Sequence, residues 1–281
     1  MKTIIIYILE TFLIAALLAA SLGHASEERT SDPLLELGAA GGVGVTPDYP
    51  ASDQVHVHYI AFPALFYRGT IFRADREEGA RARVVERPIV AVDVSGSGSF
   101  PIDSSENRAR DGMPSLDWMG EVGPRLYVRL LDARPHQLRA HLALRGAWSA
   151  RLKGGRFRGL VWAPGFAYEK RQLMGQNVSF FAKLTAEWAS KEFHDYFYAV
   201  PPDYATSTRP EYHARAGYLG TWLSGGFSYQ WGLYGLHIGG ALIRHDGAVN
   251  SESPLFKSHF NYTLFAGFSW FFYQSEARGY R

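Results

Sequence analysis

The stretch that decides the fold is Phe260 to Phe272, FNYTLFAGFSWFF. Successive side chains of an extended strand point to opposite faces. One face therefore carries Tyr262, Leu264, Ala266, Phe268, Trp270 and Phe272, and the other carries Asn261, Thr263, Phe265, Gly267, Ser269 and Phe271. The second face is smaller and more polar, except for its two phenylalanines. The pattern indicates a strand with one face towards lipid, and leaves a half-buried strand of a soluble β-sandwich as the alternative.

The N-terminus has the features of an export signal. Lys2 precedes an apolar segment that runs to Leu22, and Gly23-His24-Ala25 has the small-x-small pattern of a cleavage site. We expect a signal peptide over residues 1–25, with cleavage before Ser26. A transmembrane anchor is the alternative, but Glu10 interrupts the apolar segment. Residues 26–281 are then expected to form a single domain.

Composition narrows the class of exported protein. The formal charge of +2 gives no electrostatic reason to expect nucleic acid, and the absence of cysteine excludes a disulfide scaffold and a lipoprotein anchor. Aromatic residues make up 15% of the chain and there are 29 glycines, which suits strands, tight turns and interfacial aromatic girdles. After the signal no run of about 18 apolar residues remains, so membrane insertion would require a closed β-barrel.

Alternating segments recur along the chain. From Leu116 to Leu131, apolar residues on one face oppose Asp117, Glu121, Arg125 and Arg129 on the other. Gln137 to Ala150 repeats the pattern. Eleven candidate strands are separated by short links and by long polar loops at 96–114, 191–210 and 246–259, and the charged residues 75–83 are expected to form a turn. Because single-chain bacterial barrels have an even strand number, we predict an all-β, antiparallel transmembrane barrel of about twelve strands, with ten as the alternative.

No catalytic motif is present. A lipid-modifying hydrolase would need a serine near a histidine, and His141 with Ser149 or Ser190 is the pairing that the sequence offers. His56 and His58 share one face of a strand but lack a third metal ligand, so packing is the favoured interpretation. We expect no enzymatic activity, no cofactor and no metal. The inward charges are expected to pair across the lumen, namely Glu121, Arg125, Arg129, Arg139, Arg145 and Glu187. The aromatic residues Tyr196, Phe197 and Tyr198 are expected to belong to an interfacial girdle.

An ordered set of short motifs resembles the MltA-interacting protein (MipA) and OmpV family of Gram-negative outer-membrane proteins, over nearly all of the mature chain. The positions that carry the resemblance are Tyr49, Asp53, Gly69, Asp117, Gly120, Glu121, Gly123, Pro124, Tyr198 and Pro254. In addition, Gly267, Trp270 and Phe272 are similar in spacing to the closing strand of outer-membrane barrels, which implies an assembly signal. The chain differs from the family at Ala199, where glycine is familiar, and in the polar tail at 273–281.

The resemblance implies an outer-membrane barrel in contact with outer-membrane lipid. It further implies a scaffold that links a murein-degrading lytic transglycosylase to a murein-synthesising penicillin-binding protein at the cell wall. A narrow porin or a surface adhesin is the alternative function on the same fold, and the lipid-modifying hydrolase is a third.

Overall fold

The computed structural model describes residues 29–68, 72–75, 79–82, 85–86, 89–133, 135–151, 154–173 and 177–280. The expected signal peptide and Gly69 lie outside these ranges. Among the described residues, no helix is long and apolar enough to cross a membrane.

The described chain is almost entirely strand. Its strands of ten residues or more are β2 (Leu35–Pro47), β3 (Val55–Arg68), β7 (Val90–Ser99), β8 (Trp118–Ala133), β9 (His136–Arg151), β10 (Gly154–Lys170), β11 (Val178–Ala189), β12 (Gly217–Trp231), β13 (Tyr234–Arg244) and β14 (Phe260–Gln274). The short strands are β1 (Arg29–Pro33), β4 (Phe72–Asp75), β5 (Gly79–Ala82), β6 (Val85–Glu86) and β15 (Arg278–Tyr280). The helices are η1 (Ser104–Glu106), α2 (Lys191–Tyr198) and η3 (Pro202–Tyr204).

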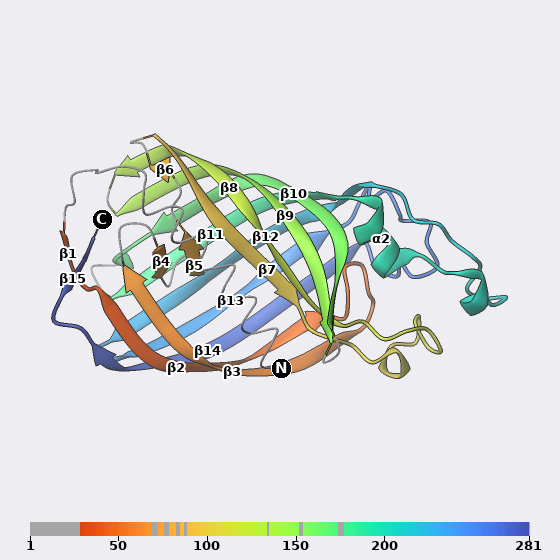
Figure 1. The fold of residues 1–281 in the computed structure, drawn as a ribbon, viewed down its shortest axis with the longest axis horizontal. Coiled ribbons are helices and arrows are strands. Elements are labelled where there is room, and N and C mark those ends of the chain that lie inside the picture. Colours follow the sequence, from red (N-terminus) through yellow and green to blue (C-terminus); the bar gives the residue numbers. More distant parts are fainter. Residues whose placement is uncertain are drawn as a thin grey trace.

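The long strands form one antiparallel meander that curves into a barrel-shaped wall (Figure 1). Each strand from β7 to β14 pairs with the next along the chain, and β14 pairs with β2. The predicted all-β antiparallel fold is confirmed, and the ten long strands agree with the lower of the two expected numbers. The two edge strands of the sheet are β5 and β6. They are not hydrogen-bonded to each other among the described residues, so the sheet does not close into a ring there.

The two faces of β14 differ as the alternation predicts. On the outer face Leu264 is 58% and Phe272 56% exposed, whereas Asn261, Ser269 and Phe271 on the inner face are buried. Exposed leucine, valine and aromatic side chains continue around the outer face of the other long strands, so the wall presents apolar side chains outward. Such a face suits contact with lipid hydrocarbon.

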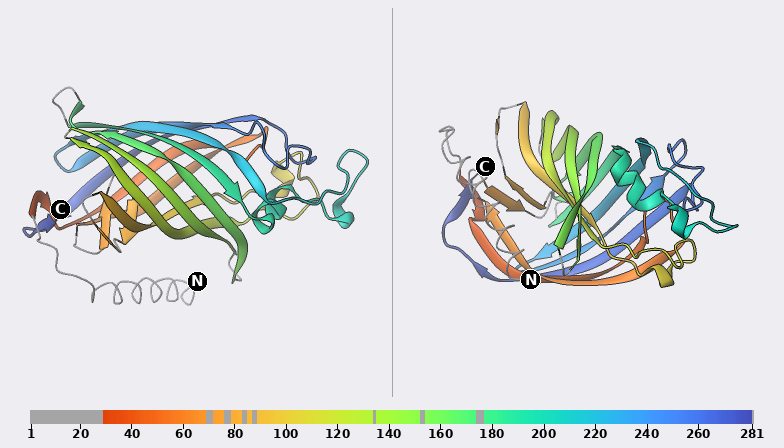
Figure 2. Two further views of the ribbon diagram at one scale, coloured as in Figure 1. Left: turned by 90° about the horizontal axis from the view of Figure 1, so that it is seen from above. Right: turned by 45° about the vertical axis from the view of Figure 1, so that its right-hand side comes forward.

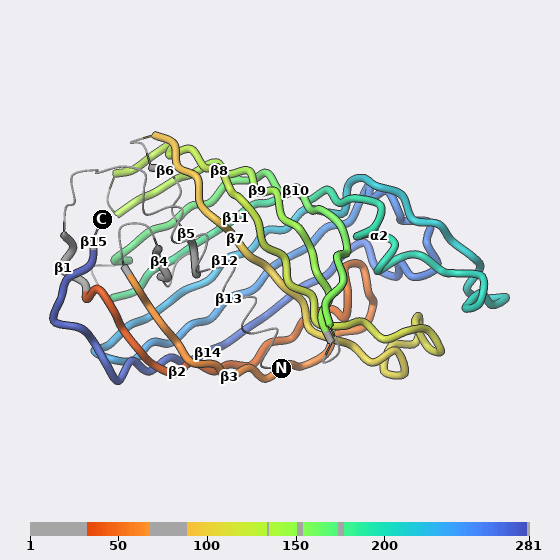
Figure 3. The backbone as a smooth tube through the Cα atoms, in the orientation of Figure 1, coloured from red at the N-terminus to blue at the C-terminus, as the bar shows by residue number. Residues whose placement is uncertain are grey.

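The two ends of the wall are built differently (Figures 2 and 3). At the turn end, β12 and β13 are joined by Gly232-Leu233, and the small sheet of β1 and β15 lies there. Aromatic rings cluster on β12, β13 and β14 near this end, with Trp231 5.3 Å from Tyr229 and 6.0 Å from Tyr234 between ring centroids. A cluster at this position suits an interfacial aromatic girdle. At the other end lie the long segments 48–54, 100–117, 190–216 and 245–259, which we call the cap.

Several boundary predictions were wrong. Residues 191–210, expected as a loop, contain α2 and η3, and the apolar residues Phe193 and Phe197 of α2 bury against the barrel wall. The polar tail after Phe272 is also structured: β14 continues to Gln274, and Arg278–Tyr280 pairs with β1. The turn expected at 75–83 includes the strand β5, and the loop expected from residue 96 begins only after Ser99.

Candidate functional site

The cap has its own hydrophobic core. Phe193 and Phe197 of α2 are buried in one cluster with Met119, Ala147 and Val161, which lie on the strands β8, β9 and β10. The helix places Phe193, His194, Phe197 and Tyr198 on one face, since positions one turn apart lie together. On the exposed side, Lys191 and Asp195 form an i,i+4 ion pair at 2.5 Å. The helix is therefore held against the barrel wall rather than projecting into solvent.

Buried hydrogen bonds join cap segments that follow different strands. The hydroxyl of Tyr198 donates to the carbonyl oxygen of Pro50 (2.9 Å). The hydroxyl of Ser253 donates to the backbone carbonyl oxygen of Tyr198 (2.7 Å). Arg110 Nη1 donates to the carbonyl oxygen of Phe197 (3.0 Å). Four cap segments thus meet around the end of α2, so the loops bridge the mouth of the barrel.

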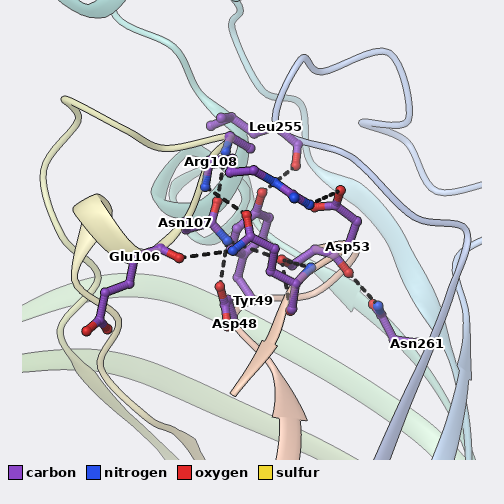
Figure 4. A network of polar contacts seen from close by, with 11 residues as sticks. Asp48, Tyr49, Asp53, Glu106, Asn107, Arg108, Leu255 and Asn261 are labelled. Atoms are coloured by element: carbon purple, nitrogen blue, oxygen red, sulfur yellow. Dashed lines mark hydrogen bonds and ion pairs between the residues drawn. The ribbon is translucent and has the colours of Figure 1, made fainter.

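A second polar network is centred on Asp48 and the residues that follow it (Figure 4). The buried Asp48 carboxylate accepts a hydrogen bond from Asn107 Nδ2 at 2.6 Å. The hydroxyl of Tyr49 donates to the carbonyl oxygen of Leu255 (2.8 Å), and Asn261 Nδ2 donates to the carbonyl oxygen of Ser52 (2.7 Å). This network ties the β2–β3 loop to the loops that precede β8 and β14.

Burial sets the ionisation of the cap. It raises the pKa of the Tyr49 and Tyr198 hydroxyls, so both remain neutral donors. Burial also lowers the pKa of Arg110. The Arg110 guanidinium lies 5.8 Å from the Tyr49 ring centroid, within the distance of a cation–π interaction.

The cap contains two buried histidines that no sequence pattern indicated. His194 and His245 are both 0% exposed, and burial lowers the pKa of each imidazole. His194 Nε2 lies 3.1 Å from the carbonyl oxygen of Gly217, and His245 Nδ1 lies 2.8 Å from that of Leu219. No motif marks them, because their role depends on how distant loops fold together.

The Tyr196–Tyr198 segment does not form an interfacial girdle. Phe197 and Tyr198 are buried in the cap core, and the Tyr196 hydroxyl lies 2.6 Å from the backbone nitrogen of Asp117, which donates to it. The Arg158 guanidinium stacks 4.2 Å from the Tyr196 ring centroid. The girdle prediction was wrong because the segment is helical and turns inward.

Inward charges form ion pairs, as predicted, but these pairs lie between nearby strands and not across the lumen. Arg145 on β9 forms ion pairs of 2.9 Å with both Glu121 on β8 and Glu187 on β11. Arg125 pairs with Asp93 at 2.7 Å. A further pair joins Arg139 to Glu169 at 3.4 Å. These pairs link neighbouring strands, or in the case of Arg145 and Glu187 the two strands on either side of β10, along one side of the lumen.

The structure does not bring the hydrolase residues together. Ser149 lies eight positions from His141 on β9, about 26 Å along the strand. Its hydroxyl accepts a hydrogen bond from Arg158 Nε (2.7 Å), and that of Ser190 accepts one from the backbone nitrogen of Leu160 (3.1 Å). His141 Nε2 lies 3.5 Å from the hydroxyl oxygen of Thr185.

His56 and His58 have separate packing roles. His56 Nδ1 lies 2.5 Å from Asp48 Oδ1, and the His58 ring stacks on Phe100 at 4.1 Å. Within the described ranges, no group of three or more potential metal ligands occurs.

The positions that carry the family resemblance divide between two places. The cap holds Tyr49, Asp53, Asp117, Tyr198 and Pro254, and β8 holds Gly120, Glu121, Gly123 and Pro124. Gly267, Trp270 and Phe272 lie on β14, with both aromatic side chains on its outer face. The cap is thus the candidate functional site, and the sequence motifs mark part of it.

An antiparallel barrel-shaped wall with an apolar outer face and a loop cap defines a protein of the outer-membrane β-barrel class. Residues 37–272 match the family model described as MltA-interacting protein MipA, and the chain belongs to this family. Family and fold together support an outer-membrane protein.

The other comparisons add little. No curated protein matches the chain. A solved structure described as a bacterial polysaccharide outer membrane secretin matches with a TM-score of 0.36 and 10% identity, covering 87% of this chain and 100% of that chain.

Proposed function

We propose that the protein is a non-enzymatic outer-membrane scaffold that binds a lytic transglycosylase and a penicillin-binding protein through its turn end. The family description names an interaction with MltA, a lytic transglycosylase, which supports the first partner. The observation that carries the proposal is the bridged mouth: the bonds from Tyr198 to Pro50 and from Arg110 to Phe197 tie the cap loops over the lumen. A barrel bridged in this way is better suited to holding partners than to passing solutes.

The turn end is the partner-binding side in this proposal. The wall places its short turns and the β1–β15 sheet at that end, where proteins of the periplasm would meet it (Figure 1). Contacts with turns of this size would bury a small area, so we expect weak binding.

Binding of a purified MltA-type lytic transglycosylase to the full chain in nanodiscs tests the proposal. Leu233→Arg alters an exposed residue of the turn end, and Ser207→Arg introduces the same side chain at an exposed position of the cap. We expect the first variant to lose binding and the second to retain it. No binding by the unaltered protein, or equal loss in both variants, would refute the scaffold role.

A narrow porin is the second candidate function, because the lumen is lined on one side by the Arg145, Arg125 and Arg139 ion pairs. Conductance in planar bilayers separates the two candidates. Steady single-channel currents from the unaltered protein would favour the porin, whereas the scaffold is expected to pass no current.

A further inference from the structure

One side of the lumen carries exposed aromatic rings where small or polar side chains are expected. Phe265 is on the inner face of β14, yet it is 41% exposed, whereas its inward neighbours Asn261 and Ser269 are 4% exposed. Phe181 on the inner face of β11 is 37% exposed. Exposed apolar surface inside a concave space is characteristic of ligand-binding sites.

The two phenylalanines belong to one row across four neighbouring strands. Phe181 pairs with Gly226, Gly226 with Gly239, and Gly239 with Phe265. The Phe181 ring covers Gly226, because a Cβ there would lie 2.9 Å from ring atom Cε1. The Phe265 ring covers Gly239 in the same way, at 2.7 Å. The two glycines therefore let both rings lie against the wall, and together they form an aromatic platform.

Charged groups begin directly beside this platform. On the adjacent strand β10, Glu169 pairs in register with Phe181. The Glu169 carboxylate forms ion pairs with Arg139 (3.4 Å) and Arg171 (2.6 Å). A molecule lying on the rings would reach this cluster with a polar substituent.

The position of the platform limits what can occupy it. Phe181 and Phe265 point away from the outer face, so neither bilayer lipid nor the outer wall of a second copy reaches them. The cap bridges one mouth, and the opposite, turn end offers a route of entry for a small molecule. Flat ring faces next to hydrogen-bonding groups favour an aromatic ligand over an aliphatic one.

We infer that the lumen binds a small aromatic molecule that carries a charged substituent, with its ring on Phe181 and Phe265 and its substituent at the Arg139–Glu169–Arg171 cluster. The site is independent of the scaffold role, since it uses the inner face of the wall and not the turn-end surface.

Two water-soluble probes test the inference, 2-naphthalenesulfonate and 1-naphthylmethylammonium, by saturation-transfer NMR with the full chain in nanodiscs. We expect saturable binding of at least one probe, and the preferred charge identifies the sign of the natural substituent. The double variant Phe181→Leu/Phe265→Leu keeps apolar side chains but removes both rings, so we expect about tenfold weaker binding.

Phe268→Leu is the matched control, because Phe268 is on the same strand as Phe265 and is 45% exposed, but on the outer face. It should bind the probe as the unaltered protein does, and a heat-modifiable gel band verifies that every variant is folded. The inference is wrong if neither probe binds saturably, if the double variant binds as tightly as the unaltered protein, or if Phe268→Leu weakens binding equally.

Discussion

The hydroxyl of Tyr198 and the carbonyl oxygen of Pro50, separated by 148 positions in the chain, are joined by a 2.9 Å hydrogen bond across the cap. Tyr198→Phe removes the donor and leaves the partly buried carbonyl oxygen of Pro50 without this partner. We expect a loss of about 1–3 kcal/mol in cap stability, because a buried polar group without a partner is costly. Hydrogen exchange of residues 191–198 measures it.

Tyr234→Phe is the control, since Tyr234 is 39% exposed at the opposite end. Equal exchange rates for Tyr198→Phe and the unaltered protein would mean that the bond does not hold the cap.

Gly123 and Gly120 on β8 are expected to differ sharply in how well they tolerate substitution by alanine. A Cβ at Gly123 would overlap the backbone oxygen of Leu144 and lie 2.8 Å from the Cα atom of Arg145, whereas one at Gly120 has nothing within 4 Å. We expect Gly123→Ala to destabilise the barrel by about 1–3 kcal/mol and Gly120→Ala to change stability by under about 0.5 kcal/mol. Urea unfolding in detergent micelles compares the two, and similar midpoints would contradict the close approach.

Arg145 is the shared partner of Glu121 and Glu187, and all three side chains are largely buried. Arg145→Met would leave two carboxylates near one another without a cation, at a cost of about 3–5 kcal/mol. The temperature at which the gel band shifts on heating should fall accordingly.

Arg244→Met removes an exposed pair with Asp246, and we expect a change under about 1 kcal/mol. If this control and Arg145→Met shift the band equally, the buried pairs do not stabilise the wall.

The cap should weaken in acid. Burial lowers the pKa of His194 and His245 below the ordinary value, so the folded cap resists taking up protons that the unfolded segment accepts. Cap stability is therefore full above about pH 6.5 and falls as the pH drops below it. Hydrogen exchange of residues 191–198, corrected for the intrinsic rate, should show less protection at about pH 5 than at about pH 7.

His213→Gln should keep this pH dependence, because the His213 side chain is 81% exposed. The double variant His194→Gln/His245→Gln should lose most of it. An unchanged pH profile in the double variant would assign the effect to other groups.

The predicted assembly signal on β14 also has a matched test. Phe272 and Tyr273 are neighbours and are 56% and 48% exposed, but only Phe272 belongs to the signal. We expect Phe272→Ala to lower the amount of heat-modifiable protein in outer-membrane fractions and Tyr273→Ala to leave it nearly unchanged. Equal amounts of heat-modifiable protein from both variants would show that assembly does not depend on the aromatic residue at position 272.

The strands of the wall were predictable because the alternation of apolar and polar residues that specifies them is local in the sequence. Alternation along Leu116 to Leu131 assigned Arg125 to the inner face and Leu126 to the outer face, and the structure places them there. The same alternation singled out Phe265 and Phe271 as anomalies on the polar face of β14. It could not say that Phe271 would stack on Phe66 while Phe265 stays exposed, because this depends on which strands are neighbours.

The cap was not predictable for the opposite reason. Polar loop composition gives no sign that Phe193 and Phe197 will bury against β8, β9 and β10, nor that His245 will lie 3.0 Å from Asn261. The short motifs marked Tyr49 and Tyr198 but not the bonds that they make.

The pairing of β2 with β14 has a consequence for biogenesis. Gly42 and Gly267 are register partners, so the first and last long strands of the wall are neighbours. Such a seam has the largest sequence separation in the sheet, and contacts of this kind form late because the chain must close a long loop to make them. Synthesis of the C-terminal strand is thus a precondition for securing the N-terminal one, and a nascent chain stalled before residue 260 would leave β2 without half of its hydrogen bonds.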